Sequence, residues 1–557
     1  MLADQSNTTQ REQRWLLLLI GLAVFVNFSG LFVTLIEPDA GIYASVAKNM
    51  VLRNNYWELI FQGKDWLDKP HFPFWITAAS FNIFGINTWA YKLPGILFLL
   101  LGAWYTYRFA LLHYSKTVAL WAAFILLTAE HILISNNDVR AEPYLTGLII
   151  AALFHFSKAV PQKLGWHLVA ACFFTGCAIM TKGPFSILII GAAVGGHLLV
   201  TKDWKTLLHW KWLVAAALIV IFISPELYSL WYQFDSHPEK MVHGKTGVSG
   251  IRFFLWEGQM SRIADTGMLR EKKDHFFYLH TLLWAFLPWS LVLFAAIVQK
   301  IKSGIKKTAG PTEWYTLLGT VLTVLLFSIS RFQLPYYTNI VFPLMAIVTA
   351  SYIPSIPKKA ASFFRISQTV FTVLLIAVPV LLQVLYAPTF SSYLPWIILM
   401  GILVLIIFLP RWFAQNNTLT AFCRAGIAVL FLNFYFNQLF YPDLLKYQAS
   451  SEAAFIANTQ YPGQPAVYVS LYTPAFEFYS QGELIQGGTN PVPPSGPSRS
   501  GTWYINEEEL AQLKSNGTKY ELVKELSHFN VSQLSLKFIN KKTRESQLIK
   551  RYLVRIL

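Results

Sequence analysis

Residues 213–223 read LVAAALIVIFI and residues 396–409 read WIILMGILVLIIFL, without a charged side chain in either stretch. Similar stretches recur along most of the 557-residue chain, which is 54% hydrophobic and only 13% charged. That charged fraction is about half of what is typical for a soluble globular domain. Long apolar runs with few charges are typical of helices that cross a bilayer, so the sequence predicts a polytopic α-helical membrane protein.

About thirteen segments have the length and composition of transmembrane helices. They are residues 15–36, 90–110, 117–135, 142–157, 165–181, 184–200, 211–231, 276–298, 313–330, 336–353, 368–386, 393–410 and 421–440. The first follows Arg11 and Arg14 and could be taken for a secretion signal. At about 22 residues it is longer than the apolar part of such a signal, so we interpret it as an anchored span.

The basic residues indicate the direction of the spans. The net charge of +16 is spread over short loops and forms no continuous basic patch, so no nucleic-acid partner is expected. If the N-terminus is cytoplasmic, the cytoplasmic loops contain Arg108, Lys116, Lys158, Lys163, Lys202, Lys205, Lys211, Lys300, Lys302, Lys306, Lys307, Lys358, Lys359, Arg365 and Arg411. The opposite short loops then contain only Arg140, Lys182 and Arg331. This asymmetry predicts a cytoplasmic N-terminus and, with an odd number of spans, a C-terminus on the outer side.

Three longer segments then lie on the outer side, namely residues 37–89, 233–275 and 441–557. The chain is predicted to consist of a transmembrane domain over residues 1–440 and a small soluble α/β domain over residues 441–557. In the second domain the long apolar runs stop and turns rich in Pro and Gly begin. Within these segments we expect a strand at 466–470 and interfacial stretches at 56–61 and 72–84.

Charged residues gather where the first span ends. The stretch EPDAGIYA (37–44) places Glu37 and Asp39 at the edge of the bilayer, where acids are costly unless they face a wet cavity or a cation. The alternative is a polar cap at a helix end. In WLDKPH (66–71), Pro70 favours an extended conformation for Lys69, beside Asp68. A lysine fixed at this level suits a lipid phosphate, and ordinary interfacial anchoring is the alternative.

Further polar breaks occur on the same predicted side. In NNDVRAEPYLT (136–146), Glu142 precedes Pro143, as expected for the first turn of a helix, and lies near the membrane face of Asp39. The breaks TKGP (181–184) and RFQLPYY (331–337) follow on that side. In WEGQMSR (256–262), Arg262 could bind a phosphate through two hydrogen bonds, or could be a solvated loop arginine. Together these breaks predict one cavity at the outer face.

The sequence supports no metal site or other cofactor. Cys172, Cys177 and Cys423 lie within apolar stretches, so neither a disulfide framework nor a cysteine metal site is indicated. The histidines of the outer segments have no recognised metal-ligand spacing. A divalent metal stays an open alternative that no motif supports.

Five motifs resemble, in this order, those of the GT-C glycosyltransferases of the aminoarabinose transferase (lipid A modifying) and protein O-mannosyltransferase type. They are Glu-Pro-Asp with Tyr-Ala at 37–44, acid-Lys-Pro at 68–70, Glu-Pro-x-Leu-Thr at 142–146, Thr-Lys-Gly at 181–183 and Leu-Pro-x-Tyr at 334–337. The motifs span about residues 15–350, and the layout matches over the whole chain. The chain departs from the family at Ile42, where an arginine is usual, and near Gly258, where a histidine is usual; the second departure argues against a zinc site of the family's type.

The resemblance implies a role for each matching residue. Asp39 would be the principal catalytic carboxylate and Glu142 a second acid. The carrier phosphate would be held by Lys69, Arg262, Lys182 and Arg331. The cavity would be lined by Glu37, Tyr43, Asp68, Arg140 and Tyr337.

The resemblance also implies the reaction. We expect an inverting transfer of a sugar from a polyprenyl (undecaprenyl) phosphate carrier to a lipid A, glycan or protein acceptor, at the periplasmic face of a bacterial inner membrane. A flippase or transporter of lipid-linked sugars is the main alternative, although charges placed throughout the bilayer's depth would suit it better. A third reading makes the C-terminal domain a binding module with the spans as its anchor.

Overall fold

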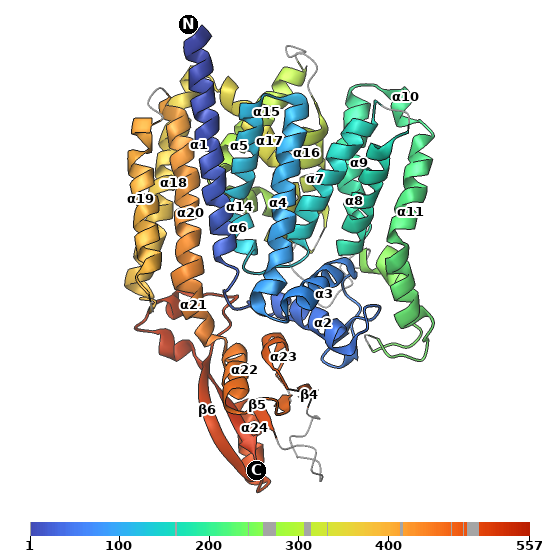
Figure 1. The fold of residues 1–557 in the computed structure, drawn as a ribbon, viewed down its shortest axis with the longest axis vertical. Helices are drawn as coiled ribbons and strands as arrows, with labels where there is room; N and C mark the ends of the chain where they lie inside the picture. The colour runs from blue at the N-terminus through green and yellow to red at the C-terminus, as the bar shows by residue number, and fades with distance from the viewer. Residues whose placement is uncertain are drawn as a thin grey trace.

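The computed structural model describes residues 2–161, 164–242, 244–259, 274–305, 313–330, 332–390, 392–412, 416–468, 471–482, 484–486 and 501–557. Long helices lie side by side in one bundle, and a smaller α/β domain lies at one end of it (Figure 1). The N-terminus is at the opposite end of the bundle. Arg262 and Arg331, two of the predicted phosphate-binding residues, lie outside the described residues.

Helices cover each of the thirteen predicted spans. They are α1 (Leu2–Ser29), α4 (Thr88–His113), α5 (Lys116–Leu127), α6 (Glu130–Ser135), α7 (Glu142–Ala159), α8 (Trp166–Lys182), α9 (Phe185–Val200), α11 (Lys211–Leu230), α14 (Phe277–Ala285), α15 (Ser290–Ile305), α16 (Tyr315–Ile329), the 3₁₀ helix η3 (Pro335–Val341) with α17 (Phe342–Tyr352), α18 (Lys358–Leu385), α19 (Leu394–Trp412) and α20 (Asn417–Tyr435). Shorter helical segments are α10 (Trp204–Leu207), η1 (Trp231–Asp235), α12 (Gly250–Arg252), η2 (Phe253–Glu257), η4 (Ile353–Ser355), η5 (Phe436–Phe440), α21 (Tyr441–Leu444) and η6 (Leu445–Tyr447).

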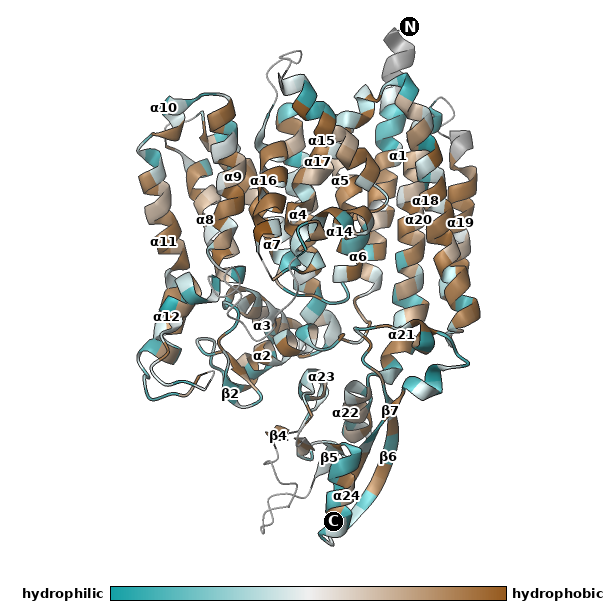
Figure 2. Cartoon of the chain, turned by 180° about the vertical axis from the view of Figure 1, so that it is seen from behind, coloured by the Kyte–Doolittle hydropathy of each residue, from teal (hydrophilic) through white to brown (hydrophobic). Residues whose placement is uncertain are grey.

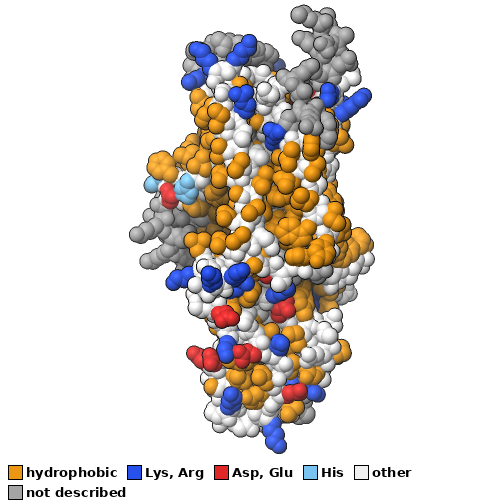
Figure 3. All heavy atoms as spheres, turned by 90° about the vertical axis from the view of Figure 1, so that its left-hand side faces the viewer, with side chains coloured by type: hydrophobic (Ala, Val, Ile, Leu, Met, Phe, Trp, Pro, Cys, Tyr) orange, Lys and Arg blue, Asp and Glu red, His pale blue; other side chains and the backbone are white. Residues whose placement is uncertain are grey.

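The surface of the bundle is that of a membrane protein. Six helical stretches of the described chain are long and apolar enough to cross a bilayer, namely Thr9–Ser29, Thr88–His113, Trp204–Asp235, Pro335–Ser355, Lys358–Leu385 and Asn417–Tyr447. Hydrophobic residues run along the middle of the bundle, and hydrophilic ones gather at its ends and on the C-terminal domain (Figure 2). On the face shown in Figure 3, hydrophobic side chains form a broad band with Lys and Arg beyond both of its edges. Large apolar side chains such as Leu213 and Val384 are exposed, as expected of residues that face lipid.

Besides the span expected at 117–135, which is interrupted between α5 and α6, two predicted spans differ from the structure. The first was expected to reach residue 36, but α1 ends at Ser29. There the buried Lys92 Nζ donates hydrogen bonds to the carbonyl oxygens of Gly30 (3.1 Å) and Val33 (2.6 Å), which holds the turn that follows the helix. The span expected at 276–298 is interrupted between α14 and α15, around Pro288, because proline cannot continue a helix.

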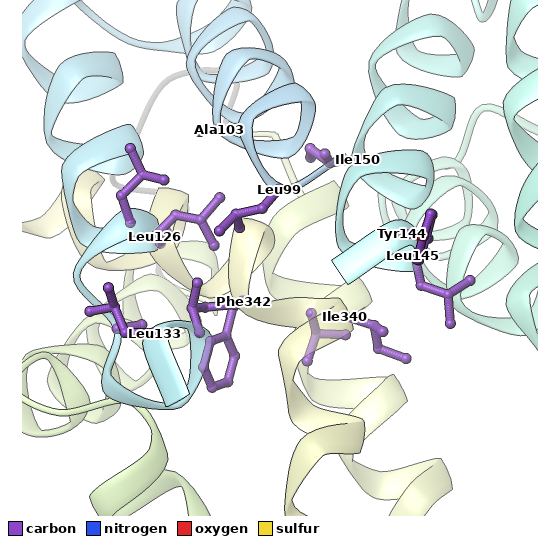
Figure 4. Close-up of a cluster of buried hydrophobic side chains, with 14 of the residues drawn as sticks. Leu99, Ala103, Leu126, Leu133, Tyr144, Leu145, Ile150, Ile340 and Phe342 are labelled. Carbon is purple, nitrogen blue, oxygen red and sulfur yellow. The ribbon is translucent and has the colours of Figure 1, made fainter. Parts of the chain in front are cut away.

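α4 packs closely on α7, near the start of α7. A Cβ added to Gly147 would collide with the carbonyl group of Phe98, so the two backbones are in direct contact. Such contacts between small residues are typical of helix pairs in membranes. Figure 4 shows the buried hydrophobic cluster beside this contact, with Leu99, Ala103, Leu126, Leu133, Tyr144, Leu145, Ile150, Ile340 and Phe342 labelled. The starts of α7 and η3 are thereby fixed next to each other.

Two helices lie across the end of the bundle that faces the C-terminal domain (Figure 1). They are α2 (Asp39–Arg53) and α3 (Phe72–Phe84), joined through the short antiparallel pair β1 (Ile60–Phe61) and β2 (Lys64–Asp65). Residues 72–84 were expected to lie along the interface, and they form α3. Residues 56–61 do not form a helix and end in β1.

The described residues after 448 form an α/β domain. Its sheet has the order β4-β3-β5-β7-β6, with β3 (Ala466–Tyr468) parallel to β4 (Leu484–Gln486) and β5 (Thr502–Ile505). The strands β6 (Tyr520–His528) and β7 (Ile549–Ile556) complete it in antiparallel pairings. Its helical segments are α22 (Ala449–Gln460), α23 (Pro474–Tyr479), α24 (Glu507–Ser515), α25 (Leu536–Ile539) and η8 (Arg544–Gln547). Of the predicted strand at 466–470, residues 466–468 are described and form β3.

Candidate active site

Arg140, in the loop between α6 and α7, joins acids from distant parts of the sequence. Its Nη1 lies 2.5 Å from Oδ2 of Asp39, the first residue of α2. Its Nε donates to Oδ2 of Asp138 at 2.8 Å, and the guanidinium lies 4.5 Å from the centre of the Tyr336 ring. The predicted meeting of Asp39 with the 136–146 stretch is therefore present, and Arg140 mediates it.

A second ion pair lies beside the first. Glu142 is the first residue of α7 and Lys182 the last of α8, and their side chains form an ion pair while only 3% and 5% exposed. The Lys182 Nζ lies 3.9 Å from the centre of the Tyr337 ring and 5.6 Å from that of Tyr336. Since Tyr336 also faces Arg140, its ring separates the two ion pairs and contacts both cations.

The loop before α3 adds a third charged pair. Lys69 pairs with the neighbouring Asp68. Burial raises the pKa of Asp39, while the positive charges of Arg140 and Lys69 oppose the rise. A carboxylate with a raised pKa is a stronger base than an ordinary one. The buried ring of Tyr43 packs on Phe74 with the ring centres 5.1 Å apart, one turn of α2 after Asp39.

Glu37 does not face this group, although it is two residues from Asp39. Its carboxylate accepts hydrogen bonds from Ala475 N (2.7 Å) and Ser450 Oγ (2.8 Å) of the C-terminal domain. The structure thus corrects the expectation that Glu37 lines the cavity, because its oxygens are turned toward that domain. Of the predicted site residues that the structure describes, it gathers Asp39, Tyr43, Asp68, Lys69, Arg140, Glu142, Lys182 and Tyr337 at the end of the bundle that faces the C-terminal domain.

The structure adds a residue that the sequence analysis missed. Glu226, fully buried in α11, accepts a hydrogen bond from the backbone N–H of His71 (2.9 Å) and lies 3.1 Å from Nδ1 of the His71 ring. The other ring nitrogen is 3.2 Å from the carbonyl oxygen of Trp57. These contacts fix the loop that carries Asp68 and Lys69. An acid inside the apolar run 211–231 was the signal that could have revealed it. Asp138 and Tyr336, which lie within quoted motifs, also belong to the site.

Cavities connect this group to the lipid-facing part of the bundle. Asp68, Lys69, Lys182, Glu226 and Gln259 are among the residues that line a small pocket, so both lysines face the same space. An apolar cavity of about 300 Å³ continues from Lys182 and Tyr337 along Phe185, Leu188 and Phe327. A second apolar cavity of about 500 Å³ lies between α8, α9 and α11. A cation at the head of an apolar cavity suits a lipid with an anionic headgroup.

No group of three or more His, Cys, Asp or Glu residues in the described part of the chain is arranged to hold a metal ion. The carboxylates of Asp39 and Glu142 are instead each paired with a cation of the protein, Arg140 and Lys182.

Comparisons with known proteins agree with this layout. A family model for dolichyl-phosphate-mannose-protein mannosyltransferase matches residues 68–229. The undecaprenyl phosphate-alpha-4-amino-4-deoxy-L-arabinose arabinosyl transferase of Erwinia tasmaniensis is 26% identical over 330 residues, which are 57% of this chain and 55% of that protein. An uncharacterized protein of Aquifex aeolicus is 26% identical over 345 residues, 62% of this chain and 64% of its own length. The matches thus span less than two thirds of these relatives.

A solved structure decides the fold. The crystal structure of ArnT from Cupriavidus metallidurans bound to undecaprenyl phosphate superimposes with a TM-score of 0.71, over 97% of each chain and at 17% sequence identity. The chain has the ArnT fold. The ArnT crystal structure in the apo state matches similarly, with a TM-score of 0.69. The resemblance to GT-C glycosyltransferases that the motifs predicted is confirmed, and the chain is a multi-pass protein of a bacterial inner membrane.

Proposed function

We propose that this chain is an inverting glycosyltransferase that moves a sugar from a polyprenyl phosphate carrier to an acceptor at the outer face of the inner membrane. The observation that carries the proposal is the position of Lys182. It lies at the head of an apolar cavity, faces the same pocket as Lys69, and is one ring away from the Asp39–Arg140 pair.

The carrier would enter from the lipid side. Its isoprenoid tail would lie in the cavity lined by Phe185, Leu188 and Phe327, and its phosphate would meet Lys182 and Lys69. Both lysines carry the positive charge that a phosphate needs, in a setting where water is largely excluded. Undecaprenyl phosphate, which is bound in the crystal structure of ArnT from Cupriavidus metallidurans, is the carrier we propose.

The transfer would be a direct displacement at the anomeric carbon. The bond from that carbon to the carrier phosphate breaks, and polyprenyl phosphate leaves with the bonding electrons, stabilised by Lys69 and Lys182. The acceptor oxygen forms the new bond from the opposite face, and its proton passes to Asp39, whose raised pKa suits a base. Arg140 orients Asp39. An acceptor phosphate would already be ionised, and Asp39 would then only orient it.

The names of similar proteins indicate which acceptors to test first. Proteins similar to this chain are named as aminoarabinose transferases, and the matching family model names protein mannosyltransferases. Lipid A is the first acceptor to test, followed by other surface glycans and proteins. We further propose that all thirteen predicted spans cross the membrane, with a cytoplasmic N-terminus and the C-terminal α/β domain in the periplasm, as the positive-inside rule predicts.

Transfer of label tests the proposal. Purified wild type and Asp39→Asn would be incubated with radiolabelled polyprenyl phosphate sugars and with lipid A, glycan or protein acceptors. We expect transfer by the wild type and a loss of about 100-fold or more in the variant, with carrier binding retained. Carrier binding without transfer from any donor, together with movement of the carrier across liposome bilayers, would favour the flippase instead.

A further inference from the structure

The C-terminal domain is in direct contact with the helix that carries Asp39. Its helix α23 packs along α2, and a Cβ added to Gly41 would lie 2.8 Å from Cβ of Pro474 and 3.0 Å from the backbone N of Ala475. The Ser45 hydroxyl, one turn further along α2, donates to the carbonyl oxygen of Pro474 at 3.0 Å. The face of α2 that turns away from the bundle is therefore covered by this domain.

Glu37 holds the beginning of α23. Its carboxylate accepts from the backbone N–H of Ala475, in the first turn of α23, and from the Ser450 hydroxyl. Its own backbone N–H donates to Oε1 of Gln448 at 2.9 Å. The residue two positions before Asp39 is thus fixed to the C-terminal domain at two points and to Gln448, directly before that domain, at a third.

Lys48 holds the end of the same helix. Its Nζ donates to the carbonyl oxygens of Glu477 (2.8 Å), Phe478 (3.0 Å) and Ser480 (2.6 Å). An ammonium group has three hydrogen-bond donors, and these three carbonyl oxygens accept all of them. The next residue, Asn49, donates to Oε1 of Glu477 at 2.9 Å. The beginning of α23 is therefore held by Glu37, just before α2, and its end by Lys48, within α2.

Tyr472, just before α23, extends this contact to the site. Its side chain is 60% exposed, and its ring centre lies 6.0 Å from that of Phe61. Desolvation, and then the negative charges of Asp39 and Asp68, raise the pKa of its phenol to about 12. Tyr472 is therefore near enough to both carboxylates for their charges to act on the phenol, and α23, which follows it in the chain, packs directly on α2.

We propose that the C-terminal domain is a working part of the transferase, in which Glu37 and Lys48 position Asp39 through α2 and Tyr472 contacts the incoming acceptor. This inference rests on the proposed function, in which the carrier lies on the bundle side of Asp39. The acceptor must then approach from the other side, where Tyr472 is exposed. A phenol offers both an apolar face and a hydroxyl, which suits a hydroxyl-bearing acceptor such as a glycan.

Four full-length variants and a control test the two halves of the inference. Lys48→Met removes the grip on α23, Gly41→Ala forces α2 and α23 apart, and Tyr472→Ala and Tyr472→Phe truncate the phenol. The control, Lys446→Met, removes an exposed lysine that lies just before the C-terminal domain and pairs with Asp443. Each protein would be measured for kcat, for the KM of the acceptor, and for hydrogen exchange of residues 39–53.

For the positioning residues we expect a loss of turnover. Lys48→Met and Gly41→Ala should lower kcat ~10-fold or more, because a small displacement of a reacting group is costly. The acceptor KM should change by less than about two-fold, and amides of α2 should exchange faster. Wild-type kcat and exchange in Lys48→Met would overturn this half; should that variant not fold, the same result in Gly41→Ala would overturn it.

For Tyr472 we expect the opposite pattern. Tyr472→Ala should raise the acceptor KM ~10-fold, with unchanged exchange in α2, and Tyr472→Phe should have an intermediate effect. An unchanged KM in Tyr472→Ala would refute the contact. If the wild type transfers no sugar at all, the proposed function fails and the acceptor contact with it, whereas the exchange measurement still decides whether Lys48 holds α2.

Discussion

Two buried Lys–Glu ion pairs lie at opposite ends of the helical bundle, and their surroundings differ. At the end remote from the C-terminal domain, Lys300 lies 2.5 Å from Glu313, with side chains 9% and 1% exposed. Lys300 also donates to Tyr114 (3.0 Å) and Thr316 (3.1 Å), and both Glu313 oxygens accept further hydrogen bonds. This pair is enclosed by its own partners and joins α15, α16 and the end of α4.

The pair Glu142–Lys182 is equally buried but borders cavities. Lys182 lines the small pocket shared with Lys69 and the head of an apolar cavity, and its neighbour Tyr336 also faces Arg140. A buried ion pair in a membrane helix therefore does not by itself mark an active site. The cavities and the adjoining acid Asp39 distinguish the two, and variants can separate their roles.

Removing both partners of each pair should give the largest contrast. Replacing a whole buried pair by apolar residues is often tolerated by the fold, since no lone charge is left behind. We expect Glu142→Leu/Lys182→Met to lower sugar transfer by ~1,000-fold or more, because the carrier phosphate loses a cation. The matched Lys300→Met/Glu313→Leu double variant should keep transfer within about three-fold. Equal losses of sugar transfer in the two double variants would show that the two ion pairs do not differ in their role in catalysis.

Removing one partner of the enclosed pair should act on stability. Glu313→Leu leaves the charge of Lys300 buried without its counterion, which should cost roughly 3–5 kcal/mol of unfolding free energy. Thermal unfolding in detergent would show a lowered midpoint. Below that midpoint, the affinity for undecaprenyl phosphate should equal that of the wild type. A normal midpoint combined with weaker carrier binding would contradict a purely structural role.

Two His–Glu pairs sharpen the same contrast between enclosed and site-facing groups. Glu226 holds His71 in a fully buried pair that fixes the Asp68–Lys69 loop, whereas Glu239 and His237 pair at 2.9 Å on the surface, with Glu239 69% exposed. Glu226→Gln should raise the KM for the carrier about 10-fold, since Lys69 loses its fixed position. Glu239→Gln serves as the control and should leave the KM unchanged. Equal KM values for wild type and Glu226→Gln would remove Glu226 from the site.

The sequence predicted the membrane fold and most of the residues that the structure gathers at the candidate site, because both leave local signals. Apolar runs reveal helices, and polar breaks such as 136–146 and 181–184 place Glu142 and Lys182 at one end once the direction of the spans is known. The different directions of Glu37 and Asp39 leave no such signal. Which of two acids faces a cavity depends on where α2 begins and on a domain that lies about 400 residues later in the sequence.

The smallest expected effect tests the different positions of Glu37, which contacts the C-terminal domain, and Asp39, which faces the site. Burial raises the pKa of Glu37 to about 7, against the hydrogen bonds from Ala475 and Ser450, which lower it. Its ordinary value is about 4.3, so the folded protein binds the extra proton between these two values. The stability that this proton confers is therefore complete below the ordinary value and is lost as the pH rises through about 7. In Glu37→Gln the group cannot titrate and its amide oxygen can still accept from Ala475, so this part of the pH dependence should vanish.

We therefore expect the wild-type unfolding midpoint to fall, relative to that of Glu37→Gln, mainly between about pH 4.3 and about pH 7. The difference should be about 1 kcal/mol, or one to a few degrees, since Glu37 is only partly shielded from solvent. The exposed Glu508 provides the control, because Glu508→Gln should keep the wild-type dependence. A wild type and a Glu37→Gln variant that respond identically to pH would mean that Glu37 is ionised throughout. Its contact with the C-terminal domain would then be an ordinary solvated one, and the contrast with Asp39 would rest on geometry alone.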